Sequence, residues 1–359
     1  MNKSKRRFKE NEKKHSKLKI FTIIFVIILI IVIALIATVN IYIDSKLGKI
    51  KIEEITNDLN QLGINAENAN GISQMSKFRN IAILGLDSRY DTYDSDYRTD
   101  CIMVASINKE TSEVQLYSIY RDTYVQMQLD GKVQMDKINH AYYNGVENTL
   151  KTINENLDLN ITEYVMADFT AIADLVDSVG GVDIDIDSEE IKYINDYIKD
   201  VSNVVGRTSK SITQTGMQHL DGIQAVSYCR IRYTSGLDYK RTERMREVLD
   251  KVISKIKSSD LITINNLLDK MLPKIRTNIT AKEIKELMPK ALSFNITKSF
   301  GWPYTTEGVW MRGDFYGPAT TLESNVKKLH EEVYRQVGYE VPDKIKEISN
   351  KIIEETGVK

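Results

Sequence analysis

The chain has 359 residues, of which 42% are hydrophobic and 28% charged, a composition that supports a packed core and excludes wholesale disorder. The net charge of −1 is unevenly placed, because residues 1–19 carry nine Lys or Arg against two Glu, a net of +7 that leaves −8 for the remainder. An acidic body excludes a general nucleic-acid binder, which needs a basic surface.

The first predicted element is a membrane span. Residues 20–40 are almost wholly apolar, and no charged residue follows until Asp44, which is enough to cross a hydrocarbon core as a helix. A cleaved signal peptide is the alternative, but the apolar run exceeds a usual signal core and no clean small-residue cleavage site follows. We therefore expect a basic cytoplasmic segment over 1–19, a single transmembrane helix over 20–43, and an extracytoplasmic remainder.

The next segment, residues 44–77, has the composition of an extracytoplasmic stalk, with helix-like apolar spacing over 49–62 and Gly63 as a helix end. A folded domain is expected over 78–330. It opens with a continuous apolar run at 79–87 that predicts a buried strand. The carboxyl end of this strand carries Asp87 and Arg89, where open α/β sheets usually hold their ligand chemistry.

The middle of the chain alternates between strand and helix patterns. Apolar runs at 101–107 and 114–119 are joined by a short turn, which predicts a hairpin. Helical spacing follows at 146–157 and 169–179, and Gly180 and Gly181 make a natural helix stop. Residues 182–186 alternate apolar and charged side chains, as expected of a half-exposed edge strand.

The later elements are helical. Asp221 is expected to cap a helix over 222–228, and Arg230 and Arg232, one residue apart, would share a face if that stretch were extended. A strong amphipathic helix over 238–256 carries Arg241 and Arg244 on one face near its start. Its apolar stripe is expected to be core rather than the wall of a lipid pocket, and comprises Val248, Leu249, Val252, Ile253 and Ile256. Another helix pair is expected within 260–330, and a charged, helix-prone tail over 331–359.

Four short stretches carry the most informative chemistry. They are Asp87-Ser88-Arg89, Arg98-Thr99-Asp100, Arg121-Asp122 and Arg230-Ile231-Arg232. Arginine forks grip phosphate oxygens in pairs, and carboxylates suit a hard divalent cation that shares its shell with phosphate. Each stretch alone is equally well explained by a turn cap or a surface ion pair. Their combination predicts a site for a diphosphate and a metal ion.

The two cysteines and four histidines do not fall at metal-ligand spacing, and the motifs of serine hydrolases, P-loop enzymes and Rossmann domains are absent from the sequence. If the stretches around Arg98 and Arg230 converge on one ligand, then Cys101 and Cys229 lie near each other. A disulfide between them is permitted outside the cell. The alternative is a pair of small buried hydrophobic residues.

These motifs, in their order along residues 78–258, resemble the LytR-CpsA-Psr family of cell-wall glycopolymer ligases. The matching runs are NIAILGLDSR, RTDCIMVASINKETSEVQLYSIYRDTYV, KINHAYYNG, DLVDSVGGVDIDI, GMQHLDGIQAVSYCRIRY and DYKRTERMREVL. The resemblance implies a three-layer α/β/α sandwich around a central mixed sheet, with a deep apolar pocket for a lipid chain. It also implies a membrane-anchored, magnesium-dependent phosphotransferase that moves an anionic glycopolymer from a polyprenyl-diphosphate carrier onto peptidoglycan.

The resemblance also assigns residues. Asp87 and Asp100 match the family's Mg2+-binding carboxylates. Arginines in and around the diphosphate site are matched by Arg89, Arg98, Arg121, Arg230, Arg232, Arg241 and Arg244. Arg98 and Arg121 are expected to act in catalysis, and Asp122 is either the base for the acceptor hydroxyl or the residue that orients Arg121.

Several positions depart from the family pattern. Tyr120 replaces a proline, Thr99 a serine and Met245 a glutamine, and the stretch from Leu237 to Arg241 lacks both glycines of a Gly-Asp-x-Gly-Arg motif. These changes put the conformation of residues 235–245, and with it the acceptor contacts, in doubt. The metal and diphosphate sets are intact.

Three functions remain open from the sequence. A transferase, a polyprenyl-diphosphate hydrolase that uses water as acceptor, and a polyprenyl-phosphate-binding regulatory protein of the attenuator type all need the same charges. Direct DNA binding is disfavoured, since no basic recognition helix appears. The polymer can be a teichoic acid, a capsule or another anionic glycan.

Overall fold

The computed structural model describes residues 38, 40–65, 74–86, 98–291 and 293–359. Two compact units are present, residues 1–49 and 50–359. The described part of the first unit is helical through Leu47. The predicted cytoplasmic segment and most of the predicted membrane helix lie outside the described residues. Among the helices that are described, none has the length and apolar content needed to cross a bilayer.

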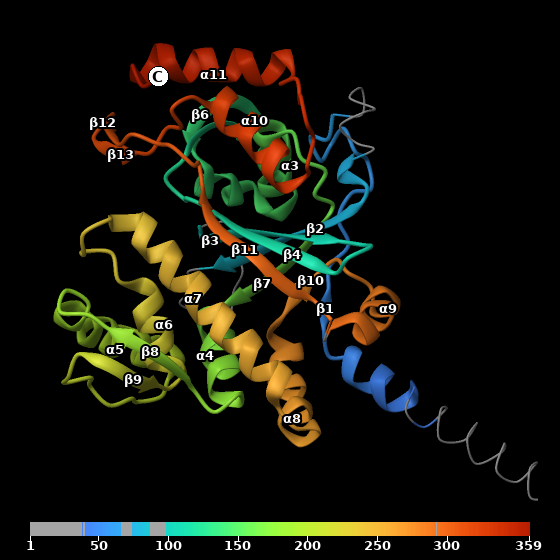
Figure 1. Ribbon diagram of the computed structural model, residues 1–359, viewed down its shortest axis with the longest axis vertical. Helices are drawn as coiled ribbons and strands as arrows, with labels where there is room; N and C mark the ends of the chain where they lie inside the picture. Colours follow the sequence, from blue (N-terminus) through green and yellow to red (C-terminus); the bar gives the residue numbers. More distant parts are fainter. Residues whose placement is uncertain (1–37, 39, 66–73, 87–97, 292) are drawn as a thin grey trace, which may run out of the picture. The chain divides into compact units, whose positions relative to one another are not determined.

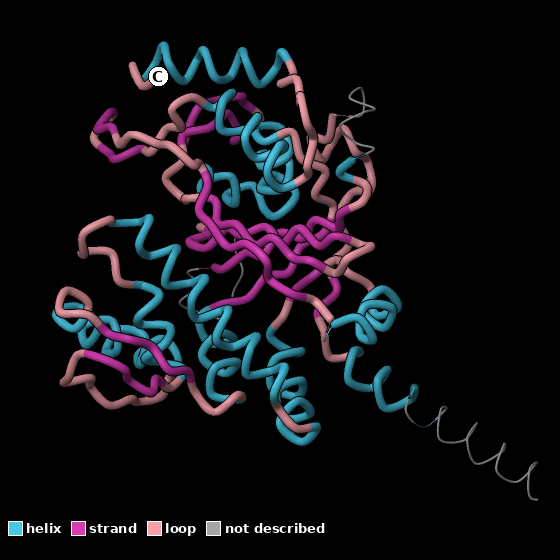
Figure 2. The backbone as a smooth tube through the Cα atoms, in the orientation of Figure 1, coloured by secondary structure: helices cyan, strands magenta, loops and turns pink. Residues whose placement is uncertain are grey.

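A seven-stranded mixed sheet forms the centre of the second unit (Figures 1 and 2). Strand β2 (Phe78–Leu86) runs antiparallel to β3 (Thr99–Asn108) and parallel to β7 (Glu163–Asp168). The remaining strands are β1 (Lys51–Ile52), β4 (Glu113–Ile119), β10 (Arg276–Thr277) and β11 (Asn295–Trp302), in the order β1-β10-β7-β2-β3-β4-β11. The predicted central mixed sheet and the β3–β4 hairpin are thus confirmed.

One face of this sheet packs against α3 (Gly145–Leu157), α10 (Leu322–Val333) and the short 3-10 helix η1 (Ile138–Asn144). Side chains that alternate along β2 and β3, such as Leu84 and Ile102, join a large cluster with Trp302 and Tyr334. Helix α11 (Asp343–Thr356) adds Ile345, Ile348 and Ile352 to the same cluster. The residues expected to be a charged tail therefore belong to the folded core.

The opposite face is covered by α4 (Phe169–Ser178), α6 (Gly222–Arg230) and α7 (Leu237–Ser258) (Figure 1). Helices α4 and α6 touch through their backbones, because a Cβ on Gly222 would lie 2.0 Å from the carbonyl oxygen of Ala173. Asp221 caps α6 as predicted, in a capping box with Gln224. Helix α9 (Ala281–Ala291) also packs on this face of the sheet, through Ile284. The other elements are β8 (Val182–Ile186), α5 (Ile191–Val205), β9 (Gly216–Leu220), α8 (Leu261–Met271) and η2 (Leu272–Lys274).

Two further hairpins complete the unit. They are β5 (Tyr124–Leu129) with β6 (Lys132–Lys137), and β12 (Val309–Met311) with β13 (Asp314–Tyr316). The half-exposed strand predicted over 182–186 is β8, which pairs only with β9 among the described strands.

The helix predicted over 49–62 is wrong. Lys51 and Ile52 form β1, which pairs with β10, and the residues after β1 are irregular until a turn ends at Gly63. Strand pairing along the sheet edge outweighs the helical spacing of the apolar residues there. Part of the expected stalk is therefore built into the folded unit.

Candidate active site

An apolar cavity of about 130 Å³ lies between the sheet and helices α4, α6 and α7. Its floor comes from β2, β3 and β7, through side chains such as Ile83, Met103 and Val165. Its roof includes Ile172 of α4, with Leu249 of α7. Strand alternation explains the floor, because the residues between these turn to the packed face of the sheet.

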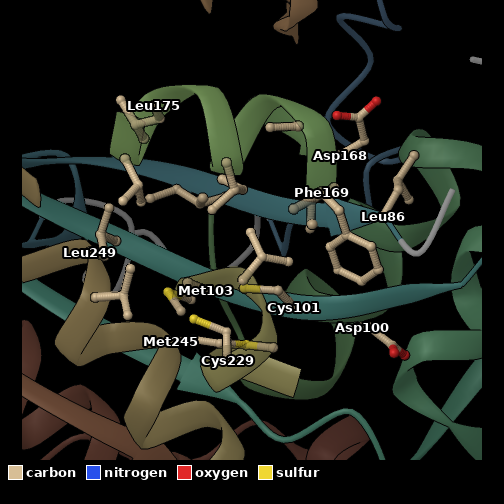
Figure 3. A pocket seen from close by; sticks show the side chains of 18 of the residues that line it. Leu86, Asp100, Cys101, Met103, Asp168, Phe169, Leu175, Cys229, Met245 and Leu249 are labelled. Atoms are coloured by element: carbon tan, nitrogen blue, oxygen red, sulfur yellow. The ribbon is translucent and has the colours of Figure 1, made fainter. Parts of the chain in front are cut away.

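The two ends of the cavity differ in chemistry (Figure 3). Leu175 and Leu249 lie at one end, whereas Asp100, Asp168 and Phe169 lie at the other. Asp168 is the N-cap of α4 and accepts a hydrogen bond from the Ala171 backbone at 2.7 Å, so its carboxylate is already used structurally. The polar end therefore depends on Asp100 and the charged groups around it.

Asp100 lies between two guanidinium groups. Arg121 Nη1 is 2.5 Å from Asp100 Oδ1, and Arg241 Nη1 is 3.3 Å from Asp100 Oδ2. Burial alone would raise the pKa of Asp100, but Arg241 and Arg121 outweigh it and hold that pKa below its usual value. Asp100 is therefore an anion at neutral pH.

Asp238, the second residue of α7, lies on the other side of the same arginines. Its Oδ1 is 2.7 Å from Arg241 Nη2 and 3.7 Å from Arg121 Nε, yet neither carboxylate oxygen makes a hydrogen bond of good geometry among the described residues. Burial raises the pKa of Asp238, and the negative charge of Asp122 adds to that rise against the opposing effect of Arg241. Asp238 is therefore a buried carboxylate whose oxygens make no well-formed hydrogen bond among the described residues.

Asp122 completes the cluster and is buried. Its carboxylate lies 3.7 Å from Arg121 Nε, 3.8 Å from Lys137 Nζ and 4.0 Å from Arg232 Nη2. Lys137 in turn contacts Asp314 at 2.6 Å. Three carboxylates and four cations therefore meet at the polar end, in a network able to exchange partners with an incoming anion.

The conditional prediction that Arg230 and Arg232 share a face of an extended stretch is wrong. Arg230 is the last residue of α6, where it contacts Asp200 at 2.5 Å and stacks 4.8 Å from the Phe169 ring centroid. Arg232 follows in a loop and turns toward Asp122. Helix α6 ends at Arg230 with Ile231 as its C-cap, so the two guanidinium groups contact different carboxylates, Asp200 and Asp122.

Two other predicted arginines are held by the protein. All three guanidinium nitrogens of Arg244 donate hydrogen bonds, to Glu190 at 2.7 Å, to the Ile231 carbonyl at 3.0 Å and to Thr234 at 2.8 Å. It is buried and fixes the loop that carries Arg232. Arg98 is exposed and lies over the Tyr143 ring, whose hydroxyl accepts its hydrogen bond.

The predicted metal pair can be placed only in part. Asp87 and Arg89 lie outside the described residues, so their place relative to Asp100 stays a prediction. Among the residues that are described, no group of three or more His, Cys, Asp or Glu side chains is arranged to hold a metal ion.

Cys101 and Cys229 both line the cavity and are free thiols, so the disulfide is not present. Burial raises the pKa of Cys101 to about 12, as expected of a thiol that packs as a small hydrophobic residue. The α7 stripe is core as expected at Val248 and Val252, which belong to a buried cluster against which Ile256 packs, but Val248, Leu249 and Val252 also line the cavity. Periodicity cannot distinguish a side chain that packs on core from one that borders a cavity.

The departures near α7 have a structural counterpart. Gly236 takes φ +91° directly before α7, so a glycine starts the helix one position earlier than the family motif places it. Tyr120 stands edge-on to Tyr239 at 4.6 Å between ring centroids, and a Cβ on Gly301 would lie 2.0 Å from the Tyr120 hydroxyl. The bulk of Tyr120 is thus accommodated by Gly301.

Sequence reasoning missed two members of the cluster, Asp238 and Lys137. Asp238 stands three residues before Arg241 on a helix, a spacing that favours an ion pair. Lys137 is the first residue of the family-matching run KINHAYYNG, but its spacing gives no sign of a contact with Asp122, because the β5–β6 hairpin brings it there.

Comparison with known proteins gives a consistent result. A sequence model of the LytR_cpsA_psr family matches residues 38–331. The polyisoprenyl-teichoic acid–peptidoglycan teichoic acid transferase TagT of Bacillus subtilis is 32% identical over 238 residues, which are 64% of this chain and 70% of the relative. The corresponding transferase TagU of Enterococcus faecalis is 29% identical over 210 residues, 58% of this chain and 63% of the relative.

Solved structures agree on the fold. The structure described as TagT bound to LIIa-WTA has 26% sequence identity and a TM-score of 0.57, and the match covers 74% of this chain and 93% of that chain. The Bacillus subtilis TagT crystal structure has 25% identity and a TM-score of 0.55, with the same coverage. The family match spans well over half of the sequence, from before the central sheet to α10. The chain belongs to the LytR_cpsA_psr family.

Proposed function

We propose that this protein is a membrane-anchored phosphotransferase that moves an anionic glycopolymer from a polyprenyl-diphosphate carrier onto peptidoglycan. One observation carries the proposal: an apolar cavity ends at a cluster of arginines and carboxylates. Such a site suits an amphiphile with a long apolar tail and an anionic head. The names of TagT and TagU, which join teichoic acid to peptidoglycan, give the same donor and acceptor classes.

The donor would bind with its polyprenyl chain in the cavity and its diphosphate at the polar end. Arg121, Arg241 and Arg232 are the cations closest to the place where the diphosphate would lie, and Arg230 flanks the entrance beside Phe169. Arginine remains charged at any relevant pH and binds phosphate with two parallel hydrogen bonds. We assign Arg244 a positioning role, because its donors already hold the Arg232 loop.

In the reaction, an acceptor sugar hydroxyl attacks the phosphorus that carries the glycopolymer. A new P–O bond forms to the acceptor, the P–O bond to the bridging oxygen breaks, and polyprenyl phosphate leaves. Negative charge builds on the bridging and equatorial oxygens, where arginines stabilise it. The hydroxyl proton must pass to a carboxylate.

Asp122 and Asp238 are the two candidate bases. Asp122 lies within 4.0 Å of three cations, Arg121, Lys137 and Arg232. Asp238 has a raised pKa, and among the described residues its oxygens make no well-formed hydrogen bond, so we assign it as the proton acceptor. Asp238→Asn should therefore lower kcat and remove the acidic limb of its pH profile. Retention of that limb in Asp238→Asn, with its loss in Asp122→Asn, would instead assign the base to Asp122.

The residues present fit a magnesium ion in chemistry, because the ionised Asp100 offers hard carboxylate oxygens at the polar end. Asp100 would hold the ion together with Asp87. When bound, Mg2+ supplies positive charge that neutralises the diphosphate. Chelation with EDTA should stop transfer, and added Mg2+ should restore it in the parent but not in Asp100→Ala.

A single experiment separates the three functions. The full-length chain in detergent is incubated with lipid-linked glycopolymer, soluble peptidoglycan oligomers and Mg2+, and the products are analysed by mass spectrometry. A covalent polymer–peptidoglycan conjugate is the expected result. Free phosphorylated polymer without conjugate would indicate a hydrolase, and tightly bound, unreacted donor would indicate a regulatory binding protein.

The proposed location is testable in cells. The basic residues before the apolar segment 20–43 favour a cytoplasmic amino terminus and an external folded unit. Protease added to intact protoplasts should degrade the folded unit. Protection until the membrane is permeabilised would contradict the proposed orientation.

A further inference from the structure

The β12–β13 hairpin presents an aromatic surface that the proposed donor site does not use. Trp310 is 78% exposed, whereas Trp302 is fully buried. Its cross-strand partner is Phe315, and the two rings stand edge-on with centroids 5.9 Å apart. An exposed tryptophan supported by a second ring is a rigid, amphipathic contact surface.

The hairpin has two distinct faces. Val309 and Met311 pack against the large core cluster, and Asp314 and Tyr316 face Lys137, by an ion pair and by a 5.1 Å contact of Nζ with the ring centroid. Strand alternation turns Trp310 and Phe315 to the opposite face. The aromatic surface is therefore free of the core.

The chain that leaves β13 joins this aromatic face to the reactive cluster. The Gly317 backbone N–H donates a 2.8 Å hydrogen bond to the Asp122 carbonyl. A Cβ on Gly317 would lie 3.7 Å from the Tyr239 hydroxyl and 3.6 Å from Thr306 Oγ1. Alternation places Gly317 on the same side as Phe315, and the Gly317 position lies beside the hydroxyl of Tyr239, the residue that follows Asp238 in α7.

The tip of the hairpin is held in place. Arg312 Nη2 contacts Glu355 of α11 at 2.8 Å, and Glu355 also accepts a hydrogen bond from the Tyr124 hydroxyl at 2.5 Å. At the base, Gly308 makes room for the Phe315 ring, because a Cβ there would lie 2.5 Å from a ring carbon. A surface fixed at both ends loses little freedom when a ligand binds.

The direction of attack favours one occupant. The leaving polyprenyl phosphate would lie on the cavity side of the reacting phosphorus, against α4, α6 and α7. In phosphoryl transfer the nucleophile and the leaving oxygen are roughly in line, so the acceptor must approach from the other side. The hairpin lies beside the charged cluster rather than beside the cavity, because Val309 and Met311 pack on the core of the other sheet face and Gly317, which follows β13, hydrogen-bonds to the Asp122 carbonyl.

We propose that the Trp310–Phe315 face is the acceptor subsite, on which a sugar ring of the peptidoglycan glycan strand stacks while a neighbouring hydroxyl reaches Asp122 and Asp238. The apolar face of a pyranose ring suits an exposed indole, and the polar edge of the sugar stays in water. This inference rests on the proposed function, because it names the place of the acceptor in that reaction.

Direct binding tests the subsite without any turnover. The chain has two tryptophans, and burial of Trp302 means that acrylamide quenches mainly Trp310. Soluble peptidoglycan glycan oligomers freed of peptide should reduce this quenching in the full-length protein with no donor present. Absence of protection at saturating oligomer would overturn the proposal, as would protection by anionic phospholipid vesicles but not by oligomers.

Kinetics test the same subsite during transfer. With donor saturating, Trp310→Ala should raise the KM for the oligomer roughly three- to tenfold, from the loss of an aromatic contact, with kcat and donor Kd near the parent values. Trp310→Phe should recover most of the affinity. Leu261→Ala, at an 83% exposed position on α8, is the matched control and should leave every parameter unchanged.

The outcomes remain distinguishable. Unchanged acceptor KM in Trp310→Ala, or a weakened donor Kd, would overturn the subsite while leaving the proposed transfer intact. Oligomer protection of Trp310 in a protein that transfers no polymer would overturn the proposed function and support glycan binding at this face.

Discussion

The two faces of the central sheet differ in packing, although the same strands form both of them. On one face, Ile102 and Tyr164 interlock with Trp302 and the helices α3, α10 and α11 in a continuous core. On the other, Met103 and Val165 face a cavity beneath α4, α6 and α7. Neighbouring residues of one strand thus serve stability and ligand binding separately, so substitutions on the two faces should be separable in experiment.

The largest expected effect is on the free energy of unfolding, and it concerns two adjacent residues of β3, Ile102 and Met103. Ile102→Ala should destabilise the folded unit by about 2–5 kcal/mol, because it opens a new cavity in packed core. Met103→Ala should destabilise less, since Met103 already borders a cavity, and should instead change donor affinity. Urea unfolding and donor titration of both variants measure this. Equal destabilisation would show that the two faces are equally packed.

At the polar end, charge geometry should dominate over packing. Arg121→Lys keeps the charge but loses the planar fork, and the loss of a charge-assisted hydrogen bond predicts a roughly ten- to hundredfold fall in transfer rate. Arg232→Lys and Arg230→Lys should fall less, because they approach the cluster from its edges. Arg79→Lys, which alters a remote ion pair with Glu163, is the control. Parent-like rates in all three site variants would refute the diphosphate site.

A larger side chain should destabilise the packed face of the sheet but should be tolerated on the cavity face. Ala82→Leu projects into the packed cluster, where overpacking costs about 1–3 kcal/mol. Ala167→Leu projects into the cavity and should be tolerated, while it weakens binding of the polyprenyl donor. Thermal unfolding with and without donor checks both. Donor binding that survives in Ala167→Leu would place the lipid elsewhere.

The smallest effects concern two carboxylates that share Arg121 and Arg241. The pKa of Asp100 is lowered, so its contribution to stability is present above the ordinary value of 3.8 and is lost as pH falls through its folded-state pKa. The pKa of Asp238 is raised, so its contribution is present below 3.8 and is lost as pH rises. At neutral pH, Asp100→Asn should destabilise and Asp238→Asn should stabilise. If this assignment is wrong, unfolding curves at several pH values will show that both substitutions change the free energy of unfolding in the same direction.

Much of the architecture could be predicted because local patterns and tertiary contacts agree there. The described part of the run at 79–87, the hairpin over 101–119 and the Asp221 cap each became the expected element. Residues 49–62 did not, since the partner of β1 is 225 positions away at Arg276 and leaves no local trace.

The sequence likewise predicted the candidate site only in part. Asp100, Arg121, Asp122 and Arg241 meet as their motifs indicate. Lys137 was missed because only a hairpin brings it there, and Arg230 was misplaced because a helix extends through it. Residue spacing predicts neither the distant partner of a strand nor the residue at which a helix ends.

The contact between Tyr124 and Glu355 has a consequence for how the molecule is made. These residues are 231 positions apart, yet the hydroxyl of one bonds to the carboxylate of the other and Arg312 joins them. During synthesis, the β5–β6 hairpin therefore cannot make this contact until α11, which follows it by more than 200 residues, has emerged. Assembly of this half of the molecule is completed only after translation has passed α11, and the exposed early strands need protection from aggregation until then.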